Sequence, residues 1–149
     1  GFGRIDVVKG LTAKIGGDEV TLGDVYKMEA SLALLLDAHI NLPALVDSPN
    51  GIWVQAAKTA MGLVAGAKLD TSKVKDDDEY KMIKEIVKLR NTSAMWSPSS
   101  RAAFILLCCS GLDDDLAKKF GYADLKDIEK SAEVKDATPY KFGFLGHSR

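Results

Sequence analysis

The side chains most often used for catalysis and metal binding are sparse in this chain. It has two cysteines, Cys108 and Cys109, and two histidines, His39 and His147. Neighbouring cysteines rarely form a disulfide because its usual geometry is strained between them, and both lie in an apolar run, so we expect them to be buried as small hydrophobic residues. No His-x-x-x-His or Cys-x-x-Cys spacing is present. The sequence therefore predicts neither a metal centre nor a cofactor.

The serines and acidic runs have simpler interpretations than catalysis. Ser97 stands before Pro98 at an expected helix start, which favours a capping role over nucleophilic attack. The acidic runs at residues 113–115 and 76–79 lack the alternating ligands and central glycine of a calcium loop, and they suit the first turns of helices. No glycine-rich phosphate loop ends in Lys-Ser or Lys-Thr. We therefore predict that the protein is not an enzyme; a small enzyme whose catalytic residues meet only in space is a less favoured alternative.

Positive charge gathers on one segment. On a helix, Lys81, Lys84 and Lys88 would lie on one face, within a sector of about 60° around the helix axis. Arg101 can extend this basic surface. Glu85 lies on the same face and can pair with Lys81, so an ordinary solvated face is the simpler interpretation. The 20 basic and 21 acidic residues leave a net charge of −1, so the bulk charge does not favour nucleic acid. Single-stranded RNA bound by Lys81, Lys84, Lys88 and Arg101, as in a nucleoprotein or coat-protein subunit, is the alternative hypothesis.

Length and composition indicate one globular domain. The chain has 149 residues, of which 46% are apolar and 28% charged. Its longest apolar run, residues 102–109, is far shorter than the roughly 20 residues of a membrane helix, so we expect no membrane contact. The start, Gly-Phe-Gly-Arg, has no initiator Met and no secretory pattern, which indicates a processed product or an excised domain. Because no cysteine framework is present, we expect a reducing location, the cytoplasm.

Helical periodicity dominates residues 21–135, which we predict to be the helical core of an all-α, compact bundle. The stretches around Leu34 and Leu106 are apolar on nearly all sides. Helices of this kind are surrounded by protein, so we expect both at the centre of the bundle, either packed on each other or partly covered by a partner. We expect about six helices, over residues 21–41, 48–66, 77–91, 97–111, 113–121 and 123–134.

The two ends of the chain contain the segments that are not expected to be helical. Residues 1–20 are predicted to form an N-terminal extended arm or small hairpin, with a turn at Gly16 and Gly17. Residues 136–149 are an expected extended C-terminal arm, because proline and two glycines interrupt large apolar side chains that are unfavourable to leave in water.

These arms are the predicted contact surfaces for a homo-oligomer or a protein partner. The residues expected to make the contacts are Phe2, Ile5, Val7, Tyr140, Phe142, Phe144 and Leu145. Such arms can exchange between identical subunits and build rings or filaments; the simpler alternative is that each arm folds back on its own core. We therefore predict a non-enzymatic structural or interaction protein that self-assembles or binds a partner through its terminal arms.

Overall fold

The computed structural model describes residues 2–133, and this part of the chain is mostly helical, with 62% of it in helices and one two-stranded hairpin. The expectation of a helical fold is therefore confirmed. The elements are α1 (Phe2–Lys9), β1 (Thr12–Ile15), β2 (Asp18–Thr21), α2 (Leu22–Val25), α3 (Glu29–Asn41), α4 (Pro43–Asp47), α5 (Ile52–Ala60), a short 3₁₀ turn (Thr71–Lys73), α6 (Asp76–Asn91), α7 (Pro98–Leu107), α8 (Asp114–Lys119) and α9 (Leu125–Ala132).

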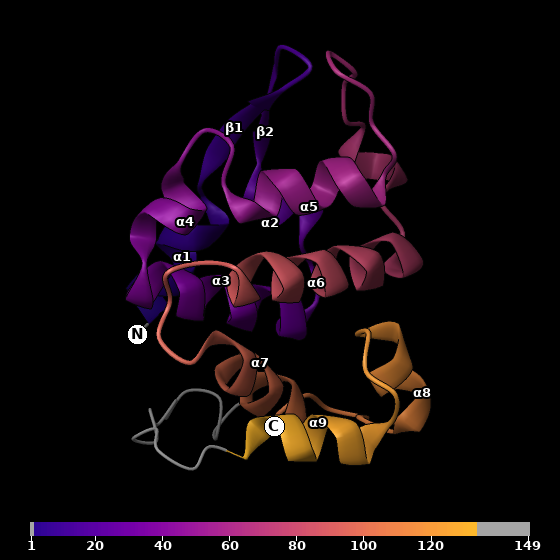
Figure 1. Cartoon of the computed structure of the whole chain (residues 1–149). Coiled ribbons are helices and arrows are strands. Elements are labelled where there is room, and N and C mark those ends of the chain that lie inside the picture. Colours follow the sequence, from indigo (N-terminus) through magenta and orange to yellow (C-terminus); the bar gives the residue numbers. More distant parts are fainter. Residues whose placement is uncertain (1, 134–149) are drawn as a thin grey trace.

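Helices α3 and α6 lie at the centre of the bundle. α3 contacts α1, α4, α6 and α7, and α6 also contacts α5, α7 and α8. In the view of Figure 1, α5 lies above α6, whereas α7 and α9 lie below it. The hairpin projects from the α5 side of the bundle (Figure 1).

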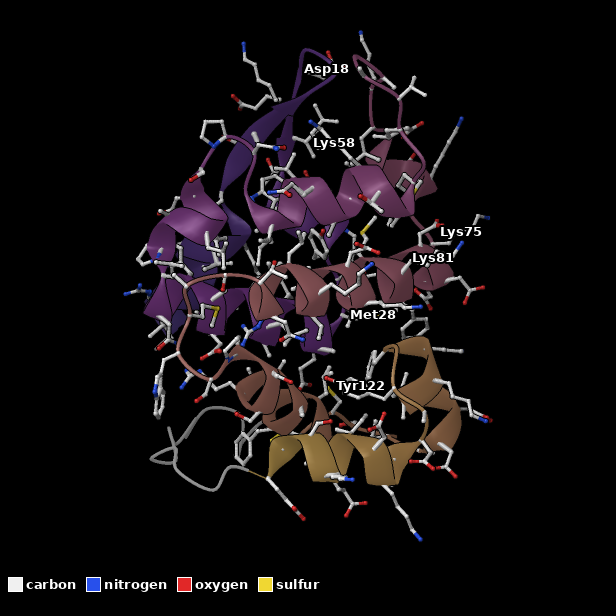
Figure 2. All side chains as sticks on the ribbon, in the orientation of Figure 1. Asp18, Met28, Lys58, Lys75, Lys81 and Tyr122 are labelled. Atoms are coloured by element: carbon white, nitrogen blue, oxygen red, sulfur yellow. The ribbon has the colours of Figure 1, made fainter. Side chains whose placement is uncertain are left out.

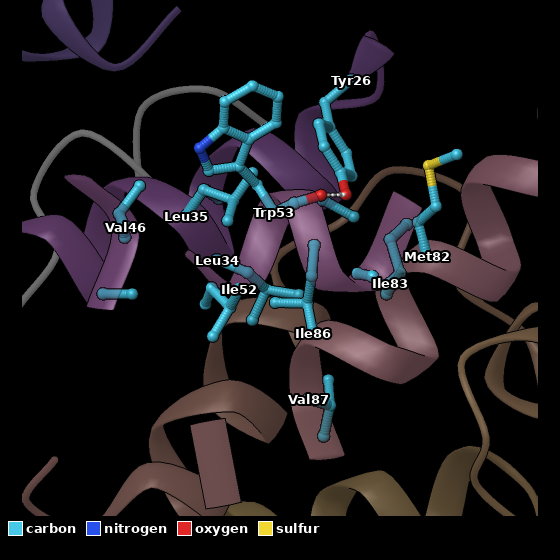
Figure 3. Packing of buried hydrophobic residues seen from close by; sticks show 14 of the residues in the cluster. Tyr26, Leu34, Leu35, Val46, Ile52, Trp53, Met82, Ile83, Ile86 and Val87 are labelled. Carbon is cyan, nitrogen blue, oxygen red and sulfur yellow. Dashed lines mark hydrogen bonds between the residues drawn. The ribbon is translucent and has the colours of Figure 1, made fainter. Parts of the chain in front are cut away.

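The hydrophobic core forms where α3, α5 and α6 meet. Figure 3 shows Leu34 and Leu35 of α3, Trp53 of α5, and Ile83 and Ile86 of α6 in one cluster, all of them almost completely buried. Apolar residues at helical spacing give α6 a stripe that faces inward. The amphipathic α6 therefore shares the centre with α3, a role that its sequence did not suggest.

The two helices expected at the centre differ in how completely they are buried. Leu34 and Leu106 are both fully buried, as expected. α7 is nevertheless accessible on one side, where Phe104 keeps 43% of its surface exposed. The helix α7 is therefore apolar on nearly all sides but is not buried on all of them.

The first residues of the chain fold differently from the expected extended arm. Residues 2–9 form α1, so the extended conformation was wrong for this stretch. The β-branched residues favoured a strand locally, but Ile5 and Val8 are three residues apart and share one helix face. Ile5 packs against the core and Val8 is fully buried. The expected hairpin is confirmed, with Thr12 opposite Thr21 and Ile15 opposite Asp18.

Several helix boundaries differ from those expected. The predicted helix over 21–41 is interrupted at residues 26–28, which separate α2 from α3. Pro43 begins the additional short helix α4, since proline suits the first helical turn. The next helix, expected to begin at Ser48 and Pro49, is α5 and runs from Ile52 to Ala60. Helix α6, by contrast, begins and ends within about one residue of the expected positions.

The turn of the hairpin provides a test of packing against the neighbouring loop. Gly16 and Gly17 both have positive φ, at 63° and 86°, so alanine is strained at either position. A Cβ on Gly16 would also overlap the backbone of Ala67 and Lys68, whereas a Cβ on Gly17 would meet nothing within 4 Å. We expect G16A to lower the free energy of unfolding clearly more than G17A, as measured by urea denaturation. Equal losses would show that the hairpin turn does not pack on residues 67–68.

Candidate functional site

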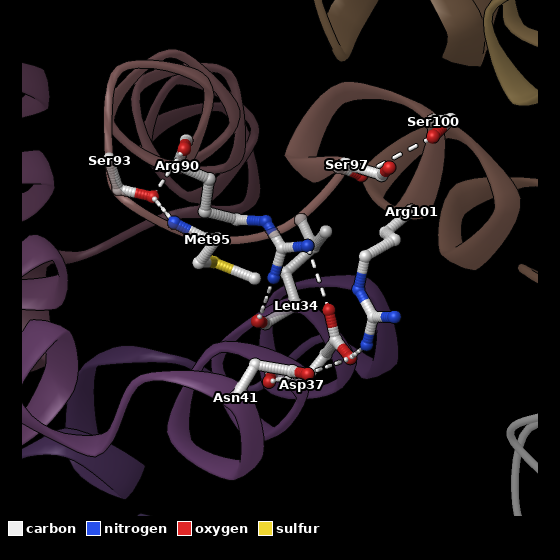
Figure 4. A network of polar contacts seen from close by, with 9 residues as sticks. All are labelled: Leu34, Asp37, Asn41, Arg90, Ser93, Met95, Ser97, Ser100 and Arg101. Atoms are coloured by element: carbon white, nitrogen blue, oxygen red, sulfur yellow. Dashed lines mark hydrogen bonds and ion pairs between the residues drawn. The ribbon is translucent and has the colours of Figure 1, made fainter. Parts of the chain in front are cut away.

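A buried ionic network joins the three helices α3, α6 and α7. Asp37 and Arg90 are fully buried, and Arg101 is 6% exposed. Arg90 Nη2 donates to Asp37 Oδ2 at 2.8 Å, while Arg101 Nη2 donates to Asp37 Oδ1 (Figure 4). Arg90 Nη1 also donates to the carbonyl oxygen of Leu34 at 2.7 Å, and Asn41 Nδ2 donates to Asp37 Oδ1 at 3.0 Å. One carboxylate therefore holds two guanidinium groups inside the protein.

Burial and the charge of Asp37 have opposite effects on the pKa of Arg90. Burial lowers the pKa of Arg90 below the usual arginine value, and the neighbouring Asp37 carboxylate opposes that shift. A buried ion pair is retained only when its geometry and additional hydrogen bonds compensate for the lost hydration. The bond from Arg90 to Leu34 and those from Asn41 to Asp37 supply such compensation.

The same network fixes both ends of the loop at residues 92–97, which we call the Trp96 loop. Arg90 lies in the last turn of α6, just before the loop, and Arg101 lies in the first turn of α7, just after it. Within the loop, Ser93 Oγ donates to the carbonyl oxygen of Arg90 at 2.6 Å and accepts from the backbone N–H of Met95 at 3.2 Å (Figure 4). Met95 is buried, so the loop is attached to the core at this residue.

Trp96 follows the buried Met95 and lies at the surface. It keeps 55% of its surface exposed. The next residue, Ser97, has the left-handed backbone conformation, with φ 46° and ψ 50°, which is uncommon for a residue other than glycine, asparagine or aspartate. Ser100 Oγ donates to the carbonyl oxygen of Ser97 at 3.3 Å. The left-handed conformation of Ser97 therefore separates the loop from α7, directly after the exposed Trp96.

An accessible stripe runs along α7, and the exposed Trp96 lies in the loop directly before this helix. Ser100, Phe104 and Leu107 follow helical spacing on the side of α7 that is not fully buried. The other sides of α7 pack against α3, α6 and α9. We call Trp96, Ser100, Phe104 and Leu107 the α7 face. None of the four side chains carries a charge, and two of them are large aromatic groups.

A second polar cluster connects α1, α3 and α4. His39 is 7% exposed, and its Nε2 lies 2.8 Å from Asp47 Oδ1. Arg4 Nε donates to His39 Nδ1 at 3.3 Å and Arg4 Nη2 donates to the carbonyl oxygen of His39 at 3.0 Å. Because Nδ1 accepts a hydrogen bond from Arg4, the ring hydrogen is on Nε2, which donates a hydrogen bond to Asp47. This arrangement attaches α1 and α4 to the end of α3.

A third cluster fixes the beginning of α3. The carboxylate of Glu79, 3% exposed, accepts from the backbone N–H groups of Lys27 and Met28 at 3.0 and 2.7 Å and from Ser31 Oγ. A carboxylate suits a helix N-terminus, where backbone N–H groups lack partners within the helix. Nearby, Tyr26 Oη donates to the carbonyl oxygen of Trp53 at 2.6 Å. Burial raises the pKa of Tyr26 well above its usual value, and Glu79 adds to the shift.

Three of the four residues expected to bind RNA lie at the surface, and one does not. Lys81, Lys84 and Lys88 are exposed on α6, and Figure 2 shows Lys81 extending outward. Lys88 Nζ lies 3.4 Å from Glu85 Oε1, so Glu85 pairs with Lys88 instead of Lys81. The expectation that Arg101 extends the basic surface is wrong, because Arg101 is on the side of α7 that faces α3 and binds Asp37 there.

The residues expected to bind a partner have different environments. Ile5 packs against the core, whereas Val7 is 54% exposed on α1. The remaining predicted contacts, the side chain of Phe2 together with Tyr140, Phe142, Phe144 and Leu145, lie outside the described part of the structure.

Two further searches cover residues 2–133 only. In this range no group of three or more His, Cys, Asp or Glu side chains is placed to hold a metal ion. No helix in the same range has the length and apolar character needed to cross a membrane.

The buried network leads to a clear expectation for stability. Replacing Asp37 with Asn leaves two buried guanidinium groups without their carboxylate, which should lower the free energy of unfolding by about 3–5 kcal/mol. The matched control is Asp47→Asn, at a side chain that is 45% exposed, where we expect a loss of about 1 kcal/mol or less. Urea denaturation of both variants measures the difference. Similar small losses would show that the Asp37 network contributes little.

No family model, no curated protein and no solved structure matches this chain. Its function therefore has to be inferred from the residues, contacts and charges of the chain itself. Among these, the fixed Trp96 loop and the α7 face favour one function most.

Proposed function

We propose that this protein acts without catalysis, as an interaction subunit that associates with further copies of itself through the α7 face. The observation that carries this proposal is the exposure of Trp96, at 55%, on a loop that is attached to the core on both sides. Tryptophan is enriched among the residues that dominate protein–protein binding energies. Burial of an aromatic side chain such as Trp96 or Phe104 in an interface contributes about 1.5–3 kcal/mol.

The fixed conformation of the loop supports this role. A flexible loop would lose conformational entropy on binding and would let the indole ring turn toward its own core. Arg90 and Arg101 attach the two flanking helices to Asp37, and the Ser93 hydrogen bonds hold the chain between them. Trp96 is therefore presented to a partner before the partner arrives, which lowers the entropic penalty of association.

The chemistry of the α7 face is compatible with a second copy as the partner. In a two-fold symmetric dimer the same surface lies on both sides of the interface. A face with strong charge of one sign would repel itself, but Trp96, Ser100, Phe104 and Leu107 are all uncharged. Depletion of charged groups and enrichment of aromatic groups are typical of the centre of an interface.

We expect the mass measured by sedimentation velocity to increase with protein concentration. Trp96→Ser and Phe104→Ser should each weaken association about tenfold or more, because each removes a large apolar group from the contact. Val64→Ser is the matched control, since Val64 is 75% exposed and belongs to the loop after α5. Figure 1 shows this loop on the opposite side of α6 from α7. A chain that stays monomeric at high concentration, or an equal effect of the Val64 change, would contradict self-association through the α7 face.

A second candidate function is binding of single-stranded RNA. It is favoured by the exposure of Lys81, Lys84 and Lys88 on one face of α6. Lys119 of the neighbouring α8 extends the positive region, with its Nζ 4.8 Å from the centre of the Tyr80 ring. The pairing of Lys88 with Glu85 reduces the charge that this face offers to phosphates, so we place RNA binding second.

The RNA hypothesis has its own test. A variant with Lys81, Lys84 and Lys88 all changed to Gln is compared with one in which the exposed Lys9, Lys14 and Lys27 are changed to Gln. Binding of a short fluorescent oligouridylate is followed by fluorescence polarisation over a range of salt concentrations. The α6 variant should lower the slope of log K against log salt by about 2, because each lost phosphate contact removes about 0.7. Identical slopes for the two variants would exclude RNA binding by this face.

A further inference from the structure

We infer that Asn50 is a site of spontaneous deamidation, at which the backbone nitrogen of Gly51 displaces ammonia from the asparagine side chain. The isoaspartate product does not fit the turn that precedes α5, so the reaction marks the chain irreversibly and weakens its fold. The inference concerns the loop between α4 and α5 and is independent of the α7 face.

The reaction requires an asparagine whose following residue leaves its own backbone nitrogen accessible. The chain has three asparagines, and the residues after them are leucine at position 42, glycine at position 51 and threonine at position 92. Glycine has no Cβ to obstruct the approach of its nitrogen to the asparagine carboxamide. Asn50 is also exposed, so water reaches its side chain. Asn50 is therefore the asparagine best placed to react.

The chemical step proceeds through a cyclic imide, and its only co-reactant is water. The nitrogen of Gly51 loses its proton to solvent and forms a bond to Asn50 Cγ, while the carboxamide nitrogen leaves as ammonia. Water then opens the imide at either carbonyl carbon. Attack at Cγ gives aspartate. Attack at the main-chain carbonyl carbon gives isoaspartate, in which the chain continues through Cβ and Cγ.

Close packing requires a glycine at position 51. A Cβ at this position would lie 2.5 Å from the carbonyl oxygen of Val46 and 3.0 Å from that of Leu45. The φ of Gly51 is −63°, which other residues adopt readily, so the lack of space excludes a side chain here and the backbone conformation does not. The fold therefore keeps the least obstructed neighbour next to Asn50.

The closed turn restrains the reaction. The backbone N–H of Gly51 donates to the carbonyl oxygen of Ser48 at 2.9 Å, and Gln55 Nε2 donates to the carbonyl oxygen of Asn50 at 2.7 Å. The attacking nitrogen has to break its hydrogen bond before solvent can remove its proton. Deamidation therefore proceeds when this exposed turn opens locally, without unfolding of the core.

The isoaspartate product is incompatible with the closed turn. It adds one atom to the main chain before Gly51, and it converts the carbonyl group that Gln55 binds into a side-chain carboxylate. The carbonyl oxygen of Gly51 accepts from the backbone N–H groups of Val54 and Gln55, both at 3.0 Å, at the start of α5. The next residues, 52–54, are at most 1% exposed. A displaced Gly51 therefore disturbs both the beginning of α5 and the core.

Peptide mapping of the full chain tests the site. The folded protein is incubated at mildly alkaline pH, digested and analysed by mass spectrometry, with Asn41 and Asn91 as controls in the same molecule. We expect the conversion of amide to carboxyl at Asn50 to be about tenfold or more faster than at the other two, because only Gly51 lacks a Cβ. Asn91 is exposed like Asn50, so it controls for access to water. Equal rates at these two positions, or no conversion at Asn50, would overturn the inference.

A pair of variants on α5 tests whether the turn controls the rate. Gln55→Ala removes the side-chain hydrogen bond to the carbonyl oxygen of Asn50, and it should accelerate deamidation of the folded chain about 2–10-fold, the effect of one hydrogen bond on local opening. Thr59→Ala, at an exposed position about one helical turn further along α5, should leave the rate unchanged. An unchanged rate in Gln55→Ala, or equal acceleration by both changes, would contradict control by the turn.

Urea denaturation measures the consequence for the fold. The isoaspartyl form is separated by chromatography and compared with Asn50→Asp, which carries the new charge without the additional chain atom. We expect a clearly lower midpoint for the isoaspartyl form. Asn50→Asp should be at least as stable as the unmodified chain, because a carboxylate is favourable near a helix N-terminus. Equal midpoints for the isoaspartyl form and Asn50→Asp would show that the turn accommodates the longer chain, and would overturn the predicted loss of stability.

Discussion

The arrangement of this bundle depends on the ion pairs that the carboxylate of Asp37 forms with two arginines. The carboxylate accepts hydrogen bonds from Arg90 of α6 and Arg101 of α7 while it lies fully buried in α3. Hydrophobic contacts among these helices are strong but non-directional, so they allow many nearly equivalent rotations. A carboxylate that binds two guanidinium groups at once is compatible with few such rotations. The network therefore fixes how α6 and α7 are oriented around α3.

The other polar contacts of α3 extend the same principle to both of its ends. Glu79 holds the backbone at the beginning of the helix, and His39 connects its end to Arg4 and Asp47. Helix α3, whose residues 30–36 are apolar except for Ser31, thus has polar contacts at its start, in its second half and at its end. Because an unsatisfied buried polar group is costly, each contact excludes arrangements in which the helix slides or rotates.

The proposed interaction face is a consequence of this orientation. Arg101 turns one side of α7 inward, so the stripe that contains Phe104 faces outward, and the Ser93 contacts with Arg90 and Met95 leave Trp96 at the surface. The network therefore links the stability of the core to the presentation of the face. Disturbing Asp37 is expected to affect both, whereas changes at Trp96 or Phe104 affect the surface alone.

Local sequence signals determined those elements whose formation needs only neighbouring residues. The acidic first turn and apolar stripe predicted α6 closely, and Gly16 and Gly17 predicted the hairpin. Ser97–Pro98 predicted the start of α7, but the capping role expected for Ser97 is wrong, because its side chain makes no capping hydrogen bond. The tertiary structure decided the helical state of residues 2–9, since Ile5 and Val8 gain from a helix only when the core is there to receive them. It also decided the place of Arg101, whose charge alone suggested a solvated side chain, because its partner Asp37 is 64 positions away in the sequence. Short-range patterns encode helix caps and turns, whereas burial of a charge depends on which distant group the fold brings to meet it.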